Sequence, residues 1–160
     1  MHPKAQAIVD ALKLAPHPEG GFYREMFRSP ILVSALPRTR PASTAIYFLL
    51  PAGGFSALHR VQSDEVWHHY DGESVELHTI DGEGTHVVSL LGRRLEFGER
   101  PQCVVPAGVW QAALPVGRFA LCGCTVAPGF DFQDFDMPTR AHLTALYPEL
   151  RVMIEKLTRP

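Results

Sequence analysis

The sequence lacks the features that mark several large classes of protein. No run approaches the roughly 20 apolar residues that a membrane-spanning helix needs. The formal net charge is only −2 at pH 7, so nothing indicates a nucleic-acid surface or a basic membrane patch. Lys4, Asp10 and Lys13 interrupt the N-terminal segment, which therefore does not resemble a secretory signal. We expect a cytoplasmic protein that binds a small molecule, with neither nucleic acid nor a membrane as a partner.

Cysteine is also scarce, and no segment has low complexity or a repeat of fixed period. The three cysteines cannot all pair within one chain, and we expect reduced thiols. Cys122 and Cys124 flank Gly123, which predicts small buried side chains on one face of a strand.

What the sequence does contain is a series of short apolar strands separated by turns. Its 160 residues, 46% hydrophobic and 20% charged, suffice for one domain with a real core. Strand-like runs recur roughly every 8–12 residues between turn signals, which is typical of an all-β sandwich or barrel. We predict a single, mainly β domain over residues 1–160, with an N-terminal helix in 1–16, a barrel at 17–135 and a helical tail at 136–160. The predicted strands cover residues 22–29, 43–50, 74–80, 85–91, 103–106, 109–114 and 119–127.

The stretch from Gly54 to Gly72, GFSALHRVQSDEVWHHYDG, has the most informative spacing. His59 lies in one strand-like run, and Glu65 opens the next run six residues later. Two strands joined by a tight turn can bring these side chains together inside a barrel. Trp67 and His69 share the face of Glu65, because side chains alternate along a strand.

This spacing resembles the first motif of the cupin superfamily, in which Gly, His-x-His, Glu and Gly follow at short intervals. His59 and Glu65 match, but Val61 stands where the second histidine is expected. In the second motif, the run PAGVW leads to Gln111, again in place of a histidine. Two of the usual four metal ligands are therefore replaced, whereas divalent transition metals normally take three or four His, Cys or carboxylate ligands.

Loss of the metal is the more economical interpretation, and we expect no cofactor. The alternative is a divalent metal held by His59, Glu65 and Gln111, with His69 or His78 as a substitute ligand.

Five collinear segments are similar to the cupin five family, which is catalogued as a domain of unknown function. Glutamine at position 111 is that family's own pattern. The resemblance implies a cupin jelly-roll barrel, or double-stranded β-helix, of the sugar-epimerase type, often paired into a homodimer. The family name carries no assigned reaction. The similar segments are HPEGGFYRE (17–25), STAIYFLL (43–50), SALHRVQSDEVWHHYDG (56–72), PQCVVPAGVWQAA (101–113) and GCTVAPGFDFQDF (123–135).

Without a metal, His59 is free to act as a general base near neutral pH, with Glu65 orienting it. The metal-free sugar epimerases that this layout resembles use a barrel histidine to abstract a proton next to a keto group, and a tyrosine to return one. Tyr47 or Tyr70, each on an adjacent strand, is the candidate acid. The residues predicted to bind the substrate are Arg24, Trp67, His69 and Gln111.

Two other functions stay open. The same barrel could hold a sugar, nucleotide or other polar metabolite without turning it over, and a metal-dependent cupin enzyme such as a dioxygenase would need a rescued ligand set. An acid across the pocket from His59 favours catalysis, whereas polar groups confined to one side favour binding. The run GFDFQDF (129–135) is predicted to cover the barrel mouth or to contact a partner subunit. His17 has no companion that the sequence identifies.

Overall fold

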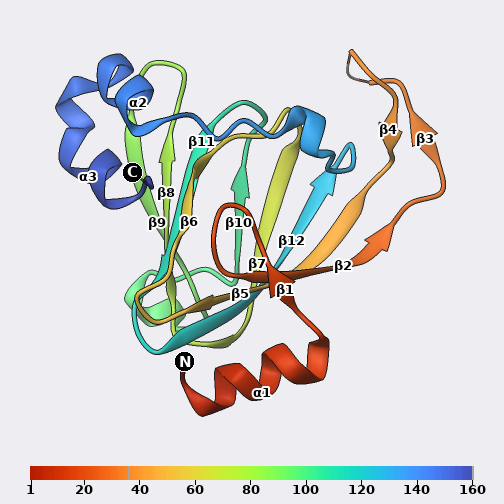
Figure 1. Cartoon of the computed structure of the whole chain (residues 1–160), viewed down its shortest axis with the longest axis vertical. Coiled ribbons are helices and arrows are strands. Elements are labelled where there is room, and N and C mark those ends of the chain that lie inside the picture. The colour runs from red at the N-terminus through yellow and green to blue at the C-terminus, as the bar shows by residue number, and fades with distance from the viewer. Residues whose placement is uncertain (36, 160) are drawn as a thin grey trace.

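The computed structural model describes residues 1–35 and 37–159, which form two facing antiparallel sheets (Figure 1). Leu36, in the predicted barrel range, and Pro160, at the end of the predicted tail, lie outside the described residues. The larger sheet has the order β1 (Ala15–Pro16), β2 (Phe22–Arg28), β5 (Thr44–Pro51), β12 (Phe119–Ala127), β7 (Asp64–Gly72) and β10 (Gln102–Val105). The smaller sheet has the order β6 (Ser56–His59), β11 (Trp110–Pro115), β8 (Val75–Ile80) and β9 (His86–Leu91).

A third, two-stranded sheet projects from the barrel (Figure 1). It pairs β3 (Leu32–Val33) with β4 (Arg40–Pro41) in the connection between β2 and β5. Every predicted strand has a counterpart in the structure, so the prediction of a mainly β fold with terminal helices is confirmed.

Side chains alternate along β7, and this alternation decides what lies inside the barrel. Glu65, Trp67 and His69 are buried, whereas Asp64 and Tyr70 are exposed, as the spacing predicts. Trp67 occupies the middle of the interior, where its ring meets Phe48 at a centroid distance of 5.6 Å. Glu65 and His69 therefore lie on opposite sides of a packed layer. The neighbouring strand β12 contributes Cys122 and Cys124 as buried free thiols, also as predicted.

A β-bulge in β2 changes which of its side chains face inward. Glu25 pairs with Ile46 and Phe27 with Ala45, so Met26 is an extra residue without a partner of its own. An inserted residue reverses the facing of every side chain that follows it. Arg28 consequently lies on the inner face of the sheet, whereas Arg24 lies on the outer one.

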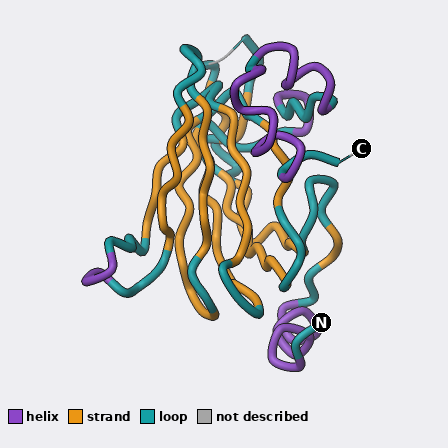
Figure 2. The backbone as a smooth tube through the Cα atoms, turned by 90° about the vertical axis from the view of Figure 1, so that its left-hand side faces the viewer, coloured by secondary structure: helices purple, strands orange, loops and turns teal. Residues whose placement is uncertain are grey.

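Helices pack on the outside of the two sheets, and Figure 2 shows them beside the strands. The first helix, α1 (Pro3–Leu12), packs Ala5 and Val9 against the larger sheet. Thr139 caps α2 (Arg140–Leu146) by accepting a hydrogen bond from the His142 N–H. Together with α3 (Arg151–Lys156), α2 buries leucine and isoleucine side chains over the smaller sheet. Short 3₁₀ turns are η1 (Leu95–Phe97), η2 (Phe132–Asp134) and η3 (Pro148–Leu150). Among the described residues, no helix has the length and apolar character needed to cross a bilayer.

Candidate functional site

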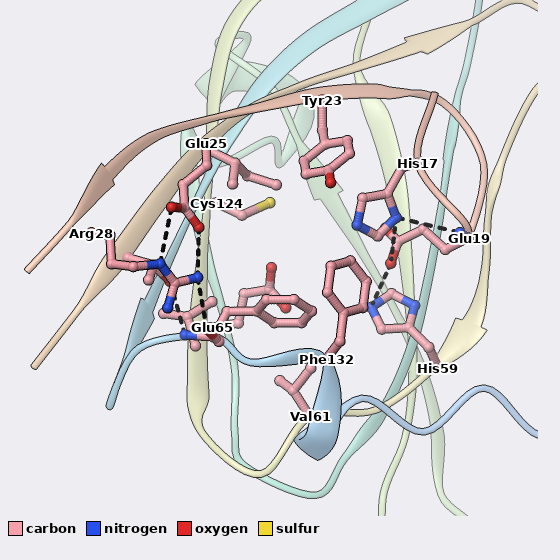
Figure 3. A pocket seen from close by; sticks show the side chains of 14 residues that line it. His17, Glu19, Tyr23, Glu25, Arg28, His59, Val61, Glu65, Cys124 and Phe132 are labelled. Carbon is pink, nitrogen blue, oxygen red and sulfur yellow. Dashed lines mark hydrogen bonds and ion pairs between the residues drawn. The ribbon is translucent and has the colours of Figure 1, made fainter. Parts of the chain in front are cut away.

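A cavity of about 300 Å³ at one end of the barrel interior is the candidate site (Figure 3). Strands from both sheets form its walls, together with the loop before β2 and the segment 128–135 that follows β12. Polar groups lie on both sides of it (Figure 3): Glu25 and Arg28 on one side, and His17, Glu19 and His59 on the other. The lining residues are His17, Glu19, Tyr23, Glu25, Arg28, Thr44, Ile46, His59, Val61, Glu65, Cys124, Val126, Phe130 and Phe132.

His59 has a fixed orientation and a defined tautomer. Its Nδ1 lies 2.7 Å from the Ala57 carbonyl oxygen, and because a carbonyl only accepts, Nδ1 carries the proton. The other ring nitrogen, Nε2, is therefore unprotonated in the neutral ring and lies 3.3 Å from Glu19 Oε2. Burial lowers the pKa of His59, although the nearby Glu65 carboxyl acts in the opposite direction. The ring of Phe135 covers the imidazole at 5.2 Å.

Glu19 comes from the loop before β2 and is almost completely buried. Its Oε1 accepts a hydrogen bond from the Ser56 hydroxyl at 2.8 Å, and its Oε2 lies 3.5 Å from His17 Nδ1. Burial raises the pKa of Glu19 to about 8, so the carboxyl is protonated at neutral pH. The loop needs Gly20, which has a φ of +114° and packs directly against the Phe55 backbone.

His17 is also neutral, and it forms part of the same wall. Its Nδ1 accepts the Glu19 backbone N–H at 3.3 Å, which leaves Nε2 as the protonated nitrogen. Burial, helped by the proximity of His59, lowers the pKa of His17 to about 4. The edge of the Tyr23 ring packs against it, with the ring centroids 4.4 Å apart. Two neutral imidazoles thus face one protonated carboxyl.

Glu65 enters the cavity from β7 of the larger sheet. Buried residues hold its carboxyl group from the side away from the cavity. The Gln111 Nε2 donates to Glu65 Oε2 at 2.6 Å, while the Trp67 Nε1 donates to Gln111 Oε1 at 2.8 Å. Gln111 is fully buried, and its amide links the Glu65 carboxyl group to the Trp67 indole in the core. Burial raises the pKa of Glu65, and the proximity of His59 partly offsets this.

An aromatic segment covers the mouth of the cavity. Phe130 and Phe132 line the cavity, and their rings pack together edge to face at 5.0 Å. The Phe130 backbone N–H donates to the Thr44 hydroxyl, and Arg28 Nη2 donates to the Phe130 carbonyl. A nearly buried ion pair, Arg40–Asp134, anchors the same segment to the β3–β4 arm with contacts of 2.6 and 2.7 Å. The run GFDFQDF, predicted to cover the barrel mouth or to contact a partner subunit, thus contributes two aromatic rings to the cavity lining, and the contact with a partner stays a prediction.

Comparisons with known proteins agree with this architecture. A family model described as "Cupin superfamily (DUF985)" matches residues 6–138. The chain belongs to this cupin family. A curated but uncharacterized protein of Saccharomyces cerevisiae is 30% identical over 146 residues, which cover 81% of this chain and 72% of the yeast protein.

Solved structures place the cupin among proteins of the same shape. A hypothetical protein from Leishmania major has a TM-score of 0.92 and 34% identity, with 98% of this chain and 99% of that chain covered. A protein of Shewanella oneidensis has a TM-score of 0.91 and 39% identity, with 98% of both chains covered. An oxalate decarboxylase of Bacillus subtilis has a TM-score of 0.58 at 17% identity, covering 89% of this chain and 36% of that one, and this likeness shows the fold alone.

Cupins commonly hold a metal at the motif positions, but the residues of this cupin do not fit one. Val61 has no ligand atom, and both polar atoms of Gln111 are engaged by Glu65 and Trp67. The Nδ1 of His59 donates to a backbone carbonyl, so only Nε2 could bind a metal, and neither Val61 nor Gln111 offers a free atom to join it. Across residues 1–35 and 37–159, no three His, Cys, Asp or Glu side chains are grouped as metal ligands. The metal content of the protein stays a prediction.

The structure separates the residues predicted for the site. His59 and Glu65 line the cavity, and Gln111 lies directly behind Glu65. Tyr47 lies outside the barrel, where its ring meets that of Tyr70 at 6.2 Å. The choice of either tyrosine as the acid is therefore not supported by its position.

The remaining predicted binding residues lie elsewhere. Arg24 is outside the barrel, where its Nη1 donates to the Leu12 carbonyl at 3.1 Å. Trp67 is 1% exposed and belongs to the core. His69 lies beyond Trp67, with its Nε2 at 2.9 Å from the Glu73 carbonyl. These three placements correct the sequence prediction, because a shared strand face does not imply a shared cavity.

The polar cavity residues that the sequence prediction missed include His17, Glu19, Tyr23, Glu25 and Arg28. The run HPEGG (17–21) carried the only local signal, since paired glycines after a His and a Glu allow a tight loop to press both side chains inward. No sequence signal marks the bulge that turns Arg28 inward.

Proposed function

We propose that this cupin is a metal-independent isomerase or epimerase that acts on a sugar or keto-sugar, with His59 as the general base. The tautomer of His59 carries the proposal. Its Nδ1–H is held by the Ala57 carbonyl at 2.7 Å, which leaves the unprotonated Nε2 at the cavity wall. Burial lowers the pKa of His59, so the ring is in the form that accepts a proton.

Glu19 supplies an acid beside this base. Its pKa of about 8 keeps the carboxyl protonated at neutral pH, and its Oε2 lies 3.3 Å from His59 Nε2. When the C–H next to a keto group faces Nε2, the Glu19 proton can turn from the imidazole to the carbonyl oxygen. The C–H proton then moves to Nε2, and the electron pair moves onto the oxygen, which the Glu19 hydrogen bond stabilises.

Inversion of the carbon requires a proton from its other face, and Tyr23 is positioned to supply it. Tyr23 lies on β2 of the larger sheet and His59 on β6 of the smaller one, so the two side chains enter the cavity from different sheets. The Tyr23 hydroxyl points into the cavity (Figure 3). We therefore propose Tyr23 for the role that the sequence prediction gave to Tyr47 or Tyr70. Polar groups on both sides of the cavity favour catalysis over simple binding.

Proton exchange with solvent tests this proposal. Keto-sugars incubated with the protein in D₂O should gain deuterium next to the keto group, detected by NMR. His59→Gln should abolish the exchange. Tyr23→Phe should keep the exchange but form no epimer. Tyr47→Phe is the matched control and should behave as wild type, because Tyr47 lies outside the barrel.

Calorimetric binding of the same sugars separates the alternatives. A sugar that binds the wild type without any deuterium uptake would make the cupin a binding module for polar metabolites. Epimer formation by Tyr23→Phe at the rate of wild type and Tyr47→Phe would remove Tyr23 from the reaction. The homodimer that the family resemblance implies stays a prediction.

A further inference from the structure

We infer that the site takes an uncharged sugar and excludes phosphorylated or nucleotide-linked ones, because Glu25 already occupies the arginine that lines the cavity. The inference rests on the proposed function for its substrate class and narrows that class. It follows from the charges of the cavity lining, the ion pair within that lining and the pairing of the arginines outside it.

Arg28 and Glu25 form a two-pronged ion pair on the cavity wall. Arg28 Nε lies 3.0 Å from Glu25 Oε1, and Arg28 Nη2 lies 2.7 Å from Glu25 Oε2. Arg28 Nη2 also donates to the Phe130 carbonyl at 3.2 Å. The Arg–carboxylate fork is the geometry in which a guanidinium would otherwise bind a phosphate. The bulge at Met26 creates the pair, because it puts both side chains on the inner face.

The rest of the cavity wall offers no positive charge to an anion. Among the described lining residues, Arg28 is the only lysine or arginine. Burial lowers the pKa of both His17 and His59, so neither ring is charged at neutral pH. Glu65 adds a buried carboxyl of its own. A phosphate placed here would lose its hydration without gaining a cation, which is costly.

Other arginines that contact the chain after β12 lie outside the cavity lining. Arg40 and Arg60 are paired with carboxylates, and Arg38 donates to the neutral amide of Gln133. Asp131 adds a further negative charge beside Arg28. The matched pairs are Arg40–Asp134 and Arg60–Asp136, with closest N···O contacts of 2.6 and 2.9 Å.

Uncharged sugars suit this wall better. Their hydroxyl groups can donate to carboxyl oxygens and accept from the Tyr23 hydroxyl or the Glu19 proton. Phe130, Phe132 and Val61 offer apolar surface for the C–H faces of a sugar ring. The site therefore recognises a substrate by hydrogen bonds and ring contact rather than by charge.

Inorganic pyrophosphate is the probe that tests the inference, because it presents the anionic diphosphate group of a sugar nucleotide without the sugar. Its dissociation constant should be measured by calorimetry at fixed ionic strength with wild type and with Glu25→Gln. Wild type should show no saturable binding. Glu25→Gln frees the Arg28 fork and removes a negative charge, so it should show saturable binding, at least about tenfold tighter than the weakest binding that the wild-type titration could detect.

Two further variants fix the location and the cause. Adding Arg28→Gln to Glu25→Gln should abolish the gained binding. Glu155→Gln breaks an exposed Arg–Glu pair on α3 with a contact of 2.8 Å and should gain none. Cooperative thermal unfolding of each variant verifies that it folds.

Saturable pyrophosphate binding by the wild type would overturn the inference, and so would the failure of Glu25→Gln to gain affinity. Neither outcome depends on turnover. A failure here is therefore distinguishable from a failure of the deuterium-exchange experiment, which tests the proposed reaction.

Discussion

Two buried carboxyl groups at opposite ends of the barrel have opposite proton affinities. Both accept a hydrogen bond from a serine hydroxyl: Glu19 from Ser56 at 2.8 Å, and Glu99 from Ser74 at 2.5 Å. Glu99 also binds the Arg94 guanidinium at 2.7 Å, and this arginine lowers its pKa to about 2. Glu19 lies beside two neutral imidazoles, and burial raises its pKa to about 8. The neighbouring groups, rather than burial alone, decide whether the carboxyl is charged.

The two environments have different consequences. Glu99 fixes the connection between β9 and β10, where the Arg94 backbone N–H also donates to it at 2.8 Å. Its interactions are complete without a ligand. Glu19 keeps a proton at the edge of a cavity, at the cost of stability at neutral pH. Perturbed carboxyls of this second kind are typical of functional sites.

Replacing Glu19 by glutamine should give the largest change in stability, and the change should be favourable. The pKa of Glu19 is raised from 4.5 to about 8, so its contribution to stability is fully present below pH 4.5 and is lost progressively up to about pH 8. At pH 7 this loss amounts to roughly 3 kcal/mol. Glutamine is uncharged at both pH values and can keep the hydrogen bond from Ser56. Glu19→Gln should therefore be more stable than wild type at pH 7 and nearly equal to it at pH 4.5.

Urea denaturation at the two pH values measures this difference. If Glu19→Gln were less stable than wild type by the same amount at both pH values, the Glu19 carboxyl would not be protonated in the folded protein at neutral pH.

Replacing Glu99 by glutamine should change stability in the opposite direction. The pKa of Glu99 is lowered from 4.5 to about 2, so its contribution is fully present above pH 4.5 and is lost as the pH falls toward 2. Glutamine cannot accept all the hydrogen bonds from Ser74 and the Arg94 backbone, which should cost about 2 kcal/mol at pH 7. The deficit should shrink in urea titrations at pH 3.

The exposed Glu73–Arg118 pair, with a contact of 3.4 Å, provides the control. Glu73→Gln should change stability by less than about 0.5 kcal/mol. A pH-independent deficit in Glu99→Gln would contradict the charged state assigned to Glu99.

The contrast between the two carboxyls could not be predicted from the sequence, although most of the fold could. Strand runs, Asp-Gly turns and the spacing of His59 and Glu65 are local signals, and local signals are sufficient for strands and their inner faces. The environment of Glu19 depends on Ser56 and His59, which are 37 and 40 positions away in the chain. Such long-range packing has no local pattern.

Two errors have simple geometric causes. Strict alternation would put Arg24 and Arg28 on the same face of the first long strand, but the bulge at Met26 turns only Arg28 into the cavity and leaves Arg24 outside. Trp67 was predicted as a binding residue because it shares the face of Glu65, but a strand of nine residues crosses the whole interior. Only the residues at one end of that face reach the cavity.

The smallest expected effect concerns the packed layer around Trp67 in the middle of the barrel. This layer separates the end that holds Glu19 from the end that holds Glu99. Trp67 donates to Gln111 Oε1 at 2.8 Å, and Gln111 in turn holds Glu65. Trp67→Phe keeps an aromatic ring in the core but leaves the buried Gln111 oxygen without its donor. We expect a loss of about 1 kcal/mol in urea denaturation from that hydrogen bond, beyond the loss caused by the smaller ring.

Trp110→Phe isolates the contribution of ring size. Trp110 is likewise buried, but its ring packs against the Arg60 guanidinium at 4.1 Å rather than donating to Gln111. Trp67→Phe should therefore cost more than Trp110→Phe, and it should leave the affinity of any bound sugar nearly unchanged, because the Trp67 ring does not reach the cavity. A large fall in sugar affinity would instead return Trp67 to the binding role that its position beside Glu65 first indicated.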